Sequence, residues 1–381
     1  MDTVTNKGNI DILEVENSSD LNTFIKVPFD IYRDDPNWVP PLISERKDFF
    51  NKTKNPFFRS AKTKLFLARK NSKYVGRIAI CVNYSYNEYH DANDGFFGFF
   101  DCFEDYEVAE LLFKVALIKL KAEGVDTMLG PCNFSTNHEV GMLIEGYDMP
   151  PVVMMTYNKS YYNDFAEKFG LRKAKDLFAY RIYADREFNP RIVKMAERMK
   201  DREGVQLRTI NMRRFDEEVE LINGLYNKAW AKNWGFVPLS KDEFRHIARD
   251  MKQIIDPDIV FVAEVKGEAV GFSLTLPDIN QALKYANGRL FPMGLAKLLW
   301  HTKVKNKVDS VRIITLGIIP EYQKRGIDTM MYLKTYDVAN EKGYKYGEMS
   351  WVLEDNFAMV RAGELMGGVL YKKYRIYGMQ V

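Results

Sequence analysis

The sequence predicts an α+β fold in which a mixed sheet with covering helices is built twice along the chain. Strand-like and helix-like stretches alternate over all 381 residues, and a chain of that length usually forms two domains. The two halves also align by hand: residues 36–40 match residues 232–238, and Gly124 and Gly343 end equivalent helices 219 positions apart. The alternative is chance similarity between two α+β stretches, which the sequence leaves open.

In the first half, short runs rich in Val, Ile and Phe predict strands, because such residues favour a pleated sheet and polar turns separate the runs. These strands are Asn9–Glu16, Leu65–Arg69, Tyr74–Val82, Gly95–Cys102, Asp126–Leu129, Val152–Thr156 and Leu177–Tyr183. Residues 107–123 carry apolar side chains at helical spacing, so they predict a helix that ends at Gly124. Another helix covers Tyr161–Phe169 and ends at Gly170.

The same order of elements returns in the second half. The strands are Val205–Asn211, Ile259–Val265, Ala269–Leu276, Val311–Ile319, Tyr346–Val352 and Tyr371–Tyr377. The helices are Phe215–Ala231, Lys241–Ile255, Ile327–Lys342 and Phe357–Met366. The charged stretch between the halves predicts a linking helix. We therefore divide the chain into an N-terminal domain, 1–184, a linking helix, 185–204, and a C-terminal domain, 205–381.

Composition excludes several classes of protein. Hydrophobic residues make up 46% and charged residues 28%, which is typical of a globular protein and not of a disordered chain. A net charge of +3 does not indicate a nucleic-acid partner, and the three cysteines and four histidines show no metal-ligand spacing. A polar N-terminus and the lack of any apolar run of about 18 residues predict neither a signal peptide nor a membrane-spanning helix, so we expect a cytoplasmic protein.

The most specific motif, residues 317–328 (GIIPEYQKRGID), is a strand that runs into a glycine-bearing turn and then a helix. Backbone N–H groups at such a turn converge, and the helix dipole adds positive potential, so the turn suits a pyrophosphate. Lys324 and Arg325 add side-chain charge. The segment resembles motif A of the GNAT (GCN5-related N-acetyltransferase) superfamily, in which a strand ending V-x-P precedes Q/R-x-x-G-x-G/A. The resemblance covers 205–381 and implies acetyl-CoA or a longer acyl-CoA as co-substrate.

This resemblance implies that the strand end binds the pantetheine arm and that an amide near 317–319 polarises the thioester carbonyl. The expected CoA-binding residues are Leu316, Gly317, Ile318, Gln323, Lys324, Arg325, Gly326, Ile327 and Asp328. Asp328 departs from the pattern, which has a small residue there. Its carboxylate would repel phosphate if it faced the ligand, and its alternative role is an N-terminal helix cap.

The corresponding loop of the first half, residues 101–107 (DCFEDYE), is acidic and lacks the glycine. Such a loop repels phosphate. We therefore expect a degenerate GNAT-like domain in the first half, so that the chain resembles a tandem GNAT protein with one working CoA site.

A later GNAT motif, N-x-x-A-x-x-L-Y-E-K-x-G-F, usually carries the tyrosine that protonates the leaving thiolate. In this chain Asn356 matches its asparagine, but Gly363 stands at the tyrosine position. Tyr371 or Tyr374 would replace that tyrosine only where the fold allows it.

The acceptor amine must lose a proton, and a carboxylate usually takes it. Glu354 is our nominee, with Asp355 beside it; the alternative for both is a solvated acid at a strand end. The predicted catalytic residues are thus Asn356, Glu354 and Tyr371.

Two segments are candidates for the acceptor pocket. Residues 226–236 lie between the first two helices of the second half, where the pocket wall lies in GNAT enzymes, and a polar loop lies in the first half. The predicted substrate-binding residues are Trp230, Trp234, Phe236, Asn137, His138 and Glu139. Core packing is the alternative for the aromatic residues, and packing or capping for the polar ones.

The insertion at 281–308 has no acidic residue. Its basic residues are Lys284, Arg289, Lys297, Lys303, Lys305 and Lys307, and its apolar residues include Leu290, Phe291, Met293, Leu295, Leu298, Leu299 and Trp300. Such a segment suits a membrane surface or a long acyl chain. The alternative is a buried helix with a solvated basic face.

The first half also resembles a set of bacterial tandem GNAT proteins, in PNWVPPL, VGRIAI, GFFGFFDCFED and GPCNFSTNHEVGMLIEGYD. That set includes the bacterial ceramide-synthase type, which joins a fatty acyl group from a thioester to a long-chain amine. The main hypothesis is an acyl-CoA-dependent N-acyltransferase acting on a small-molecule or lipid amine, with peripheral membrane contact through 281–308. The alternatives are a non-catalytic acyl-CoA or lipid-binding protein and an aminoacyl transferase that uses aminoacyl-tRNA.

Overall fold

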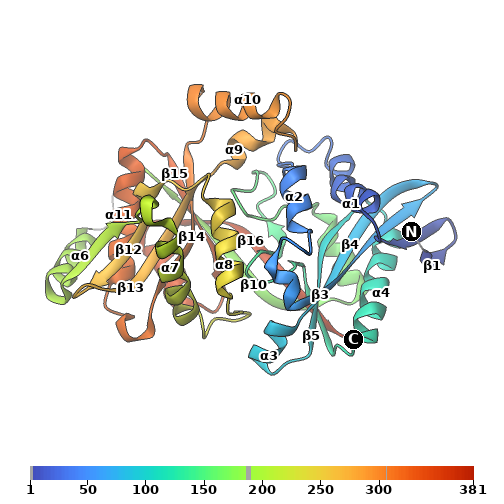
Figure 1. Ribbon diagram of the computed structural model, residues 1–381, viewed down its shortest axis with the longest axis horizontal. Coiled ribbons are helices and arrows are strands. Elements are labelled where there is room, and N and C mark those ends of the chain that lie inside the picture. Colours follow the sequence, from blue (N-terminus) through green and yellow to red (C-terminus); the bar gives the residue numbers. More distant parts are fainter. Residues whose placement is uncertain (1–2, 186–189, 306) are drawn as a thin grey trace. The chain divides into compact units, whose positions relative to one another are not determined.

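The computed structural model describes residues 3–185, 190–305 and 307–381 and groups them into two compact units (Figure 1). The first unit is built from Met1–Asp176, Leu283–Leu298 and Lys372–Val381. The second is built from Leu177–Ala282 and Leu299–Tyr371. Each unit has a mixed sheet covered by helices, which confirms the predicted fold class.

The sheet of the first unit runs in the order β1-β2-β3-β4-β5-β6-β16, with β9 also paired to β16. The strands of this sheet are β1 (Thr3–Lys7), β2 (Ile10–Glu14), β3 (Ala61–Lys70), β4 (Lys73–Asn83), β5 (Asp94–Cys102), β6 (Thr127–Gly130), β9 (Met142–Glu145) and β16 (Val369–Gln380). Two further short strands, β7 (Cys132–Asn133) and β8 (Glu139–Val140), pair with each other. The helices are α1 (Ser18–Ile31), α2 (Ile43–Phe49), α3 (Tyr84–His90), α4 (Tyr106–Ala122) and α5 (Tyr161–Phe169). β5 is buried along almost its whole length because α1 and α4 both pack on this sheet.

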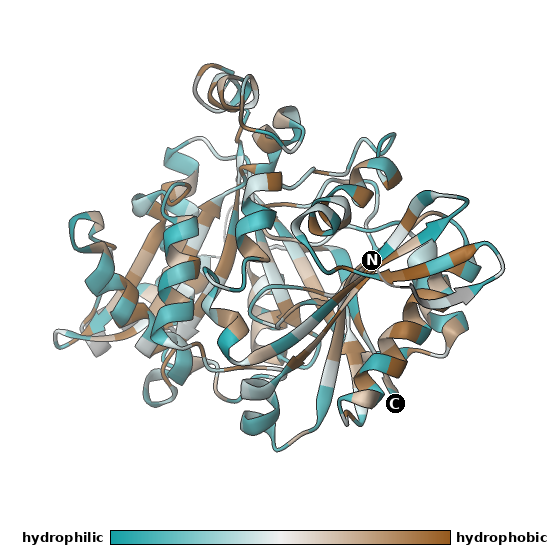
Figure 2. Cartoon of the chain, turned by 45° about the vertical axis from the view of Figure 1, so that its right-hand side comes forward, coloured by the Kyte–Doolittle hydropathy of each residue, from teal (hydrophilic) through white to brown (hydrophobic). Residues whose placement is uncertain are grey.

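The sheet of the second unit runs in the order β10-β15-β14-β13-β12-β11. The strands are β10 (Arg172–Tyr183), β11 (Val205–Thr209), β12 (Val260–Val265), β13 (Glu268–Pro277), β14 (Ser310–Ile318) and β15 (Tyr346–Leu353). The helices are α6 (Pro190–Glu203), α7 (Phe215–Ala229), α8 (Lys241–Met251), α9 (Asn280–Leu283), α11 (Ile327–Glu341) and α12 (Phe357–Leu365), and α10 (Gly294–Leu299) lies in the insertion. One hydrophobic cluster joins α6 and α11 to the sheet, and other clusters join α7 to the sheet and to α8. In Figure 2 the strands carry much of the hydrophobic colour, and the surface helices are mixed.

Each unit has one parallel strand pair among its described strands, and each pair is short. β5 pairs with β6 only from Asp94 to Phe96, and β14 pairs with β15 only from Ser310 to Ile313. Beyond Ile313, β14 continues beside β13, while β15 continues beside β10. The two strands therefore part, and we call residues Ile314–Ile318 and Ser350–Leu353 the fork.

The structure divides the chain at other points than the sequence does. Residues 372–381 belong to the first unit, because β16 pairs there with β6 and β9, and residues 177–184 belong to the second, because β10 pairs there with β15. The predicted linking helix exists as α6, but it is part of the second unit, where Ala196 packs with Ile327; residues 186–189 lie outside the described part. The expected strand at 152–156 is not formed.

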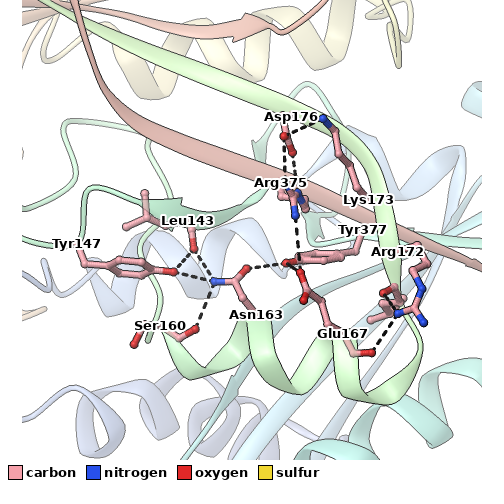
Figure 3. A network of polar contacts seen from close by, with 11 residues as sticks. Leu143, Tyr147, Ser160, Asn163, Glu167, Arg172, Lys173, Asp176, Arg375 and Tyr377 are labelled. Carbon is pink, nitrogen blue, oxygen red and sulfur yellow. Dashed lines mark hydrogen bonds and ion pairs between the residues drawn. The ribbon is translucent and has the colours of Figure 1, made fainter.

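Polar contacts of β16 hold it in the first unit (Figure 3). Arg375 donates from Nε and Nη2 to the two carboxylate oxygens of Asp176, at 2.8 and 3.1 Å. Tyr377 donates its hydroxyl to Asn163 Oδ1 at 2.9 Å. Burial alone would raise the pKa of Asp176, but the hydrogen bonds from Arg375 and Lys173 hold that pKa below its usual value.

Asp176→Asn is expected to destabilise the protein by about 1.5–3 kcal/mol at pH 7, because it removes the charge that Arg375 binds. A depressed pKa stabilises the fold above the unfolded-state pKa of about 3.9, and this stabilisation is lost as the pH falls through the folded-state pKa. The difference from wild type, measured by urea unfolding, should therefore shrink as the pH falls below the unfolded-state pKa of about 3.9. Asp164→Asn, an exposed neighbour, is the control. A difference that stays constant over that range would contradict the assignment.

Candidate active site

The fork begins at a bulge in β14. Leu274 pairs with Thr315 and Thr275 pairs with Ile313, so Ile314 is an extra residue on β14. Bulges of this kind re-aim side chains and often lie beside active sites. Past the bulge, the β14 edge that faced β15 has no parallel partner, so its backbone groups can bind an extended ligand arm.

The β14 strand leads directly into the turn that opens α11. Gly326 is the N-cap of α11, with a φ of 75°, and no side chain caps the helix. Lys324 also has a positive φ, 60°, and is exposed. Asp328 lies in the first turn of α11, so it is not the cap that its alternative role required. The uncapped first turn presents backbone N–H groups and positive potential to a bound anion.

A row of polar side chains lies where β14 and β15 begin to part. Arg312 and Glu348 are register partners and are both buried, with 1% and 0% of their surface exposed. Arg312 Nε donates to Ser350 Oγ at 3.0 Å, Ser350 donates to Glu348 Oε1, and the Tyr371 hydroxyl donates to Glu348 Oε2. We call these four residues the proton row.

Two aromatic rings at the proton row, those of Tyr371 and Trp351, contact guanidinium groups. The Arg181 guanidinium lies 4.4 Å from the ring centre of Tyr371, and the Arg312 guanidinium lies 5.0 Å from the ring centre of Trp351. Beyond the last register pair of β14 and β15, two side-chain atoms are buried without a hydrogen-bond partner among the described residues. They are Thr315 Oγ1 on β14 and Trp351 Nε1 on β15. Buried donors of this kind are costly unless a ligand or water satisfies them.

Trp230, at the end of α7, lies directly over the predicted CoA-binding strand end. A methyl group built on Gly317 would stand 1.9 Å from Trp230 Cζ3, so only glycine leaves room for the indole ring. Trp230 also stacks on Tyr226, with ring centres 4.9 Å apart. Phe236 is buried against Tyr226 and packs in the core, and Trp234 is half-buried. The structure therefore brings together Gly317 and Trp230 from two separate predictions.

The predicted catalytic residues have different surroundings. Tyr371 belongs to the proton row, whereas Asn356 caps α12 by accepting from the Met359 N–H at 3.3 Å. Glu354 is half-buried in the turn after β15. Gly363 packs against Tyr180, and a Cβ there would lie 2.6 Å from Met349 Cε, so the usual GNAT tyrosine would fit here only if these side chains moved.

In the first unit, the matching strand fork is filled by the protein itself. A Cβ on Gly98 would lie 1.9 Å from the Cys132 carbonyl oxygen, and the Phe99 N–H donates to Asn133 Oδ1 at 2.7 Å. Asp105 caps α4 with its own carboxylate and pairs with Lys70. Protein groups thus occupy the positions that would bind a thioester arm and a phosphate. The degenerate first half stays a prediction.

The polar loop of the first unit is packed. His138 contacts the rings of Phe49 and Phe57 edge-on. Burial alone would raise the pKa of Glu139, but its ion pair with Arg46 holds the pKa below its usual value. Asn137 is half-buried beside them. A substrate role for these residues stays a prediction.

Sequence reasoning missed Arg312, Glu348 and Ser350. The available signal was a charged residue inside each of two apolar strand segments, VRIITLGI and YGEMSWVL. A charge within a buried strand is rarely structural unless it is paired. Within the described residues, no group of three or more His, Cys, Asp or Glu side chains is arranged to hold a metal ion.

Comparison with known proteins shows the family. A protein of Caulobacter vibrioides (strain NA1000 / CB15N), named bacterial ceramide synthase, is 38% identical over 376 residues, which cover 97% of both chains. The chain belongs to the bacterial ceramide synthase family. Protein YghO of Escherichia coli (strain K12), another relative, is 35% identical over 370 residues, which cover 96% of this chain and 94% of YghO. No family model matches the chain.

Solved structures confirm the tandem fold of this family member. A tandem GNAT protein from the clavulanic acid biosynthesis pathway aligns with a TM-score of 0.56 over 97% of this chain and 98% of that one. At 10% identity this likeness shows the fold alone. Fold and family together make the protein an N-acyltransferase. No helix of the described residues has both the length and the hydrophobicity needed to cross a membrane.

Proposed function

We propose that the second unit transfers an acyl group from acyl-CoA to the primary amine of a long-chain lipid. The observation that carries the chemistry is the proton row at the base of the fork, next to an unpaired strand edge and an uncapped helix start. The printed name of the Caulobacter relative supports the lipid amine as acceptor.

The residues at the fork fit acyl-CoA. The free edge of β14 offers backbone groups to a pantetheine arm, and Thr315 Oγ1 and Trp351 Nε1 are buried donors that lack partners in the described part of the chain. The α11 start with Lys324 and Arg325 offers N–H groups and positive charge to a pyrophosphate. Asp328, in the first turn, is the one carboxylate among the predicted CoA-binding residues.

When bound, acyl-CoA supplies an activated thioester carbonyl. Glu348 is fully buried and Tyr371 is half-buried, so Tyr371 is the end of the proton row that meets the reactants. Tyr371 and Glu348 together take a proton from the attacking amine and return one to the departing sulfur. Arg312 and Ser350 orient the Glu348 carboxylate. One backbone amide near Gly317–Ile318, on the free edge of β14, polarises the carbonyl.

The function is tested by following free thiol release from palmitoyl-CoA and acetyl-CoA, with a long-chain amine or a short amine present. The proposal expects thiol release that depends on the long-chain amine. Acyl-CoA binding without amine-dependent thiol release would indicate a binding protein, and activity only with aminoacyl-tRNA would indicate aminoacyl transfer. Either outcome overturns the proposal.

Gly326→Glu is expected to weaken CoA binding at least tenfold, because it adds a negative charge at the α11 start and strains a φ of 75°. The matched control is Gly343→Glu, just beyond the other end of α11, where φ is 81° and nothing lies within 4 Å of a built Cβ. Calorimetric titration with CoA measures both affinities. An equal loss of CoA affinity in the two variants would indicate backbone strain alone and would contradict an anion-binding site at the start of α11.

A further inference from the structure

The insertion between β13 and β14 exposes several large apolar side chains within a short stretch of the chain. The exposed fraction is 74% for Phe291, 63% for Met293, 61% for Val304, 52% for Trp300 and 50% for Leu299. Helix α10 and the π-helical turn Trp300–Val304 that follows it are exposed at most positions. The predicted alternative of a buried helix is therefore wrong.

This segment is fixed at its start and is not a loose loop. The Ile43 N–H donates to the Gly288 carbonyl at 2.9 Å, and a Cβ on Gly288 would lie 2.6 Å from the Phe29 ring. Gly294 is buried, and a Cβ there would lie 1.6 Å from the Arg289 carbonyl oxygen. The exposed side chains Phe291 and Met293 therefore lie on a turn whose flanking glycines, Gly288 and Gly294, are closely packed.

The charged residues of the insertion itself are all basic. No acidic residue lies between Gln281 and Val308. Within the described part of the chain, neither Arg289 nor Lys297 forms an ion pair, although both are exposed. They line a hollow of about 550 Å³ together with Lys26, Phe29, Phe291 and Met293. Asp30, which pairs with Arg33, is the acidic residue on that lining.

We propose that residues 289–305 dock on the surface of an anionic lipid bilayer. The apolar side chains enter the boundary between headgroups and acyl chains, the indole of Trp300 lies at headgroup level, and Arg289 and Lys297 meet lipid phosphates. Basic charge without acidic charge fits the negative surface of such a bilayer better than it fits a protein surface of mixed charge. The proposal does not rest on acyl transfer, and it adds a route by which a lipid amine would reach the enzyme.

The test is co-sedimentation of the full chain with phosphatidylglycerol-containing vesicles and with pure phosphatidylcholine vesicles, without acyl-CoA or amine. We expect binding to the anionic vesicles that falls as salt is raised. Arg289→Glu with Lys297→Glu should weaken it at least tenfold, since each basic residue near an anionic surface contributes roughly fivefold. Phe291→Ser should weaken binding several-fold at every salt concentration.

The matched controls lie on α4, at the surface of the first unit. Ile118 is 60% exposed, so Ile118→Ser changes a comparable apolar side chain, and Lys119→Glu with Lys121→Glu changes two basic ones. The proposal is overturned if the controls weaken binding as much as the insertion variants, or if neutral vesicles bind equally well. It is also overturned if these side chains mediate self-association in the absence of lipid, because a second copy would then be the occupant.

Discussion

Glu348→Gln is expected to lower the rate of acyl transfer by about 10²–10⁴-fold while leaving the affinity for acyl-CoA unchanged. Glutamine has nearly the shape of glutamate and still hydrogen-bonds to Ser350 and Tyr371, but it cannot accept the proton of the attacking amine. Because Glu348 is buried in the row and Tyr371 is its partner, Tyr371→Phe should cost a similar factor.

A double variant of Glu348 and Tyr371 distinguishes a proton relay through both residues from two independent contributions to the rate of acyl transfer. If Glu348 and Tyr371 act as one unit, Glu348→Gln with Tyr371→Phe should be little slower than either single variant. Glu354→Gln is the control, because Glu354 is the other nominated base and lies in the turn after β15. A full loss of transfer in Glu354→Gln, with Glu348→Gln near wild type, would move the base to the strand end. Urea unfolding of each variant separates lost chemistry from lost folding.

Gly317→Ala is expected to reduce acyl transfer at least 10²-fold and to destabilise the fold by about 1–3 kcal/mol. The added methyl group would lie 1.9 Å from Trp230 Cζ3, so either the ring or the β14 edge must move. Both are predicted to contact the reactants, and a displacement of about 1 Å at a reacting centre costs roughly that factor.

A second substitution should identify the cause of this loss. Trp230→Ala in the Gly317→Ala background removes the overlap, so it should recover part of the lost stability, whereas Trp230→Ala alone should destabilise. Gly347→Ala, on the neighbouring strand, is the control, because its Cβ would meet nothing closer than Val311 at 3.5 Å. Equal effects of Gly317→Ala and Gly347→Ala on rate and stability would argue against the contact between Gly317 and Trp230 as the cause.

The features that depend on residues close together in the sequence, such as helix ends and turns, could be predicted from the sequence. Glycine after a periodic apolar run predicts where a helix stops, and Gly124 and Gly343 both follow the predicted helix ends. The turn at 323–328 was visible because a glycine, two basic residues and a strand stand next to one another in the chain. The fold class and the predicted anion-binding turn follow from such neighbours.

What the sequence did not reveal depends on pairing between distant strands. Arg312 and Glu348 lie 36 positions apart, and only the parallel register of β14 and β15 makes them neighbours. Tyr371 was chosen as a replacement acid, but its carboxylate partner appears only once β16 is placed. The predicted domain boundary differs from the structure for the same reason. Nothing in the sequence near residue 372 indicates that the strand there pairs with the first half of the chain.

The placement of β16 has a consequence for how the protein is made. Residues 372–381 are synthesised after the whole second unit, yet the first unit needs them for its sheet, for the Arg375–Asp176 pair and for the buried Tyr377. During synthesis the sheet of the first unit therefore lacks β16, so its edge strand is unpaired. An unpaired edge strand can bind chaperones or pair with a non-native strand. Expression of the two halves as separate fragments cut near residue 204 would leave the N-terminal fragment without this strand.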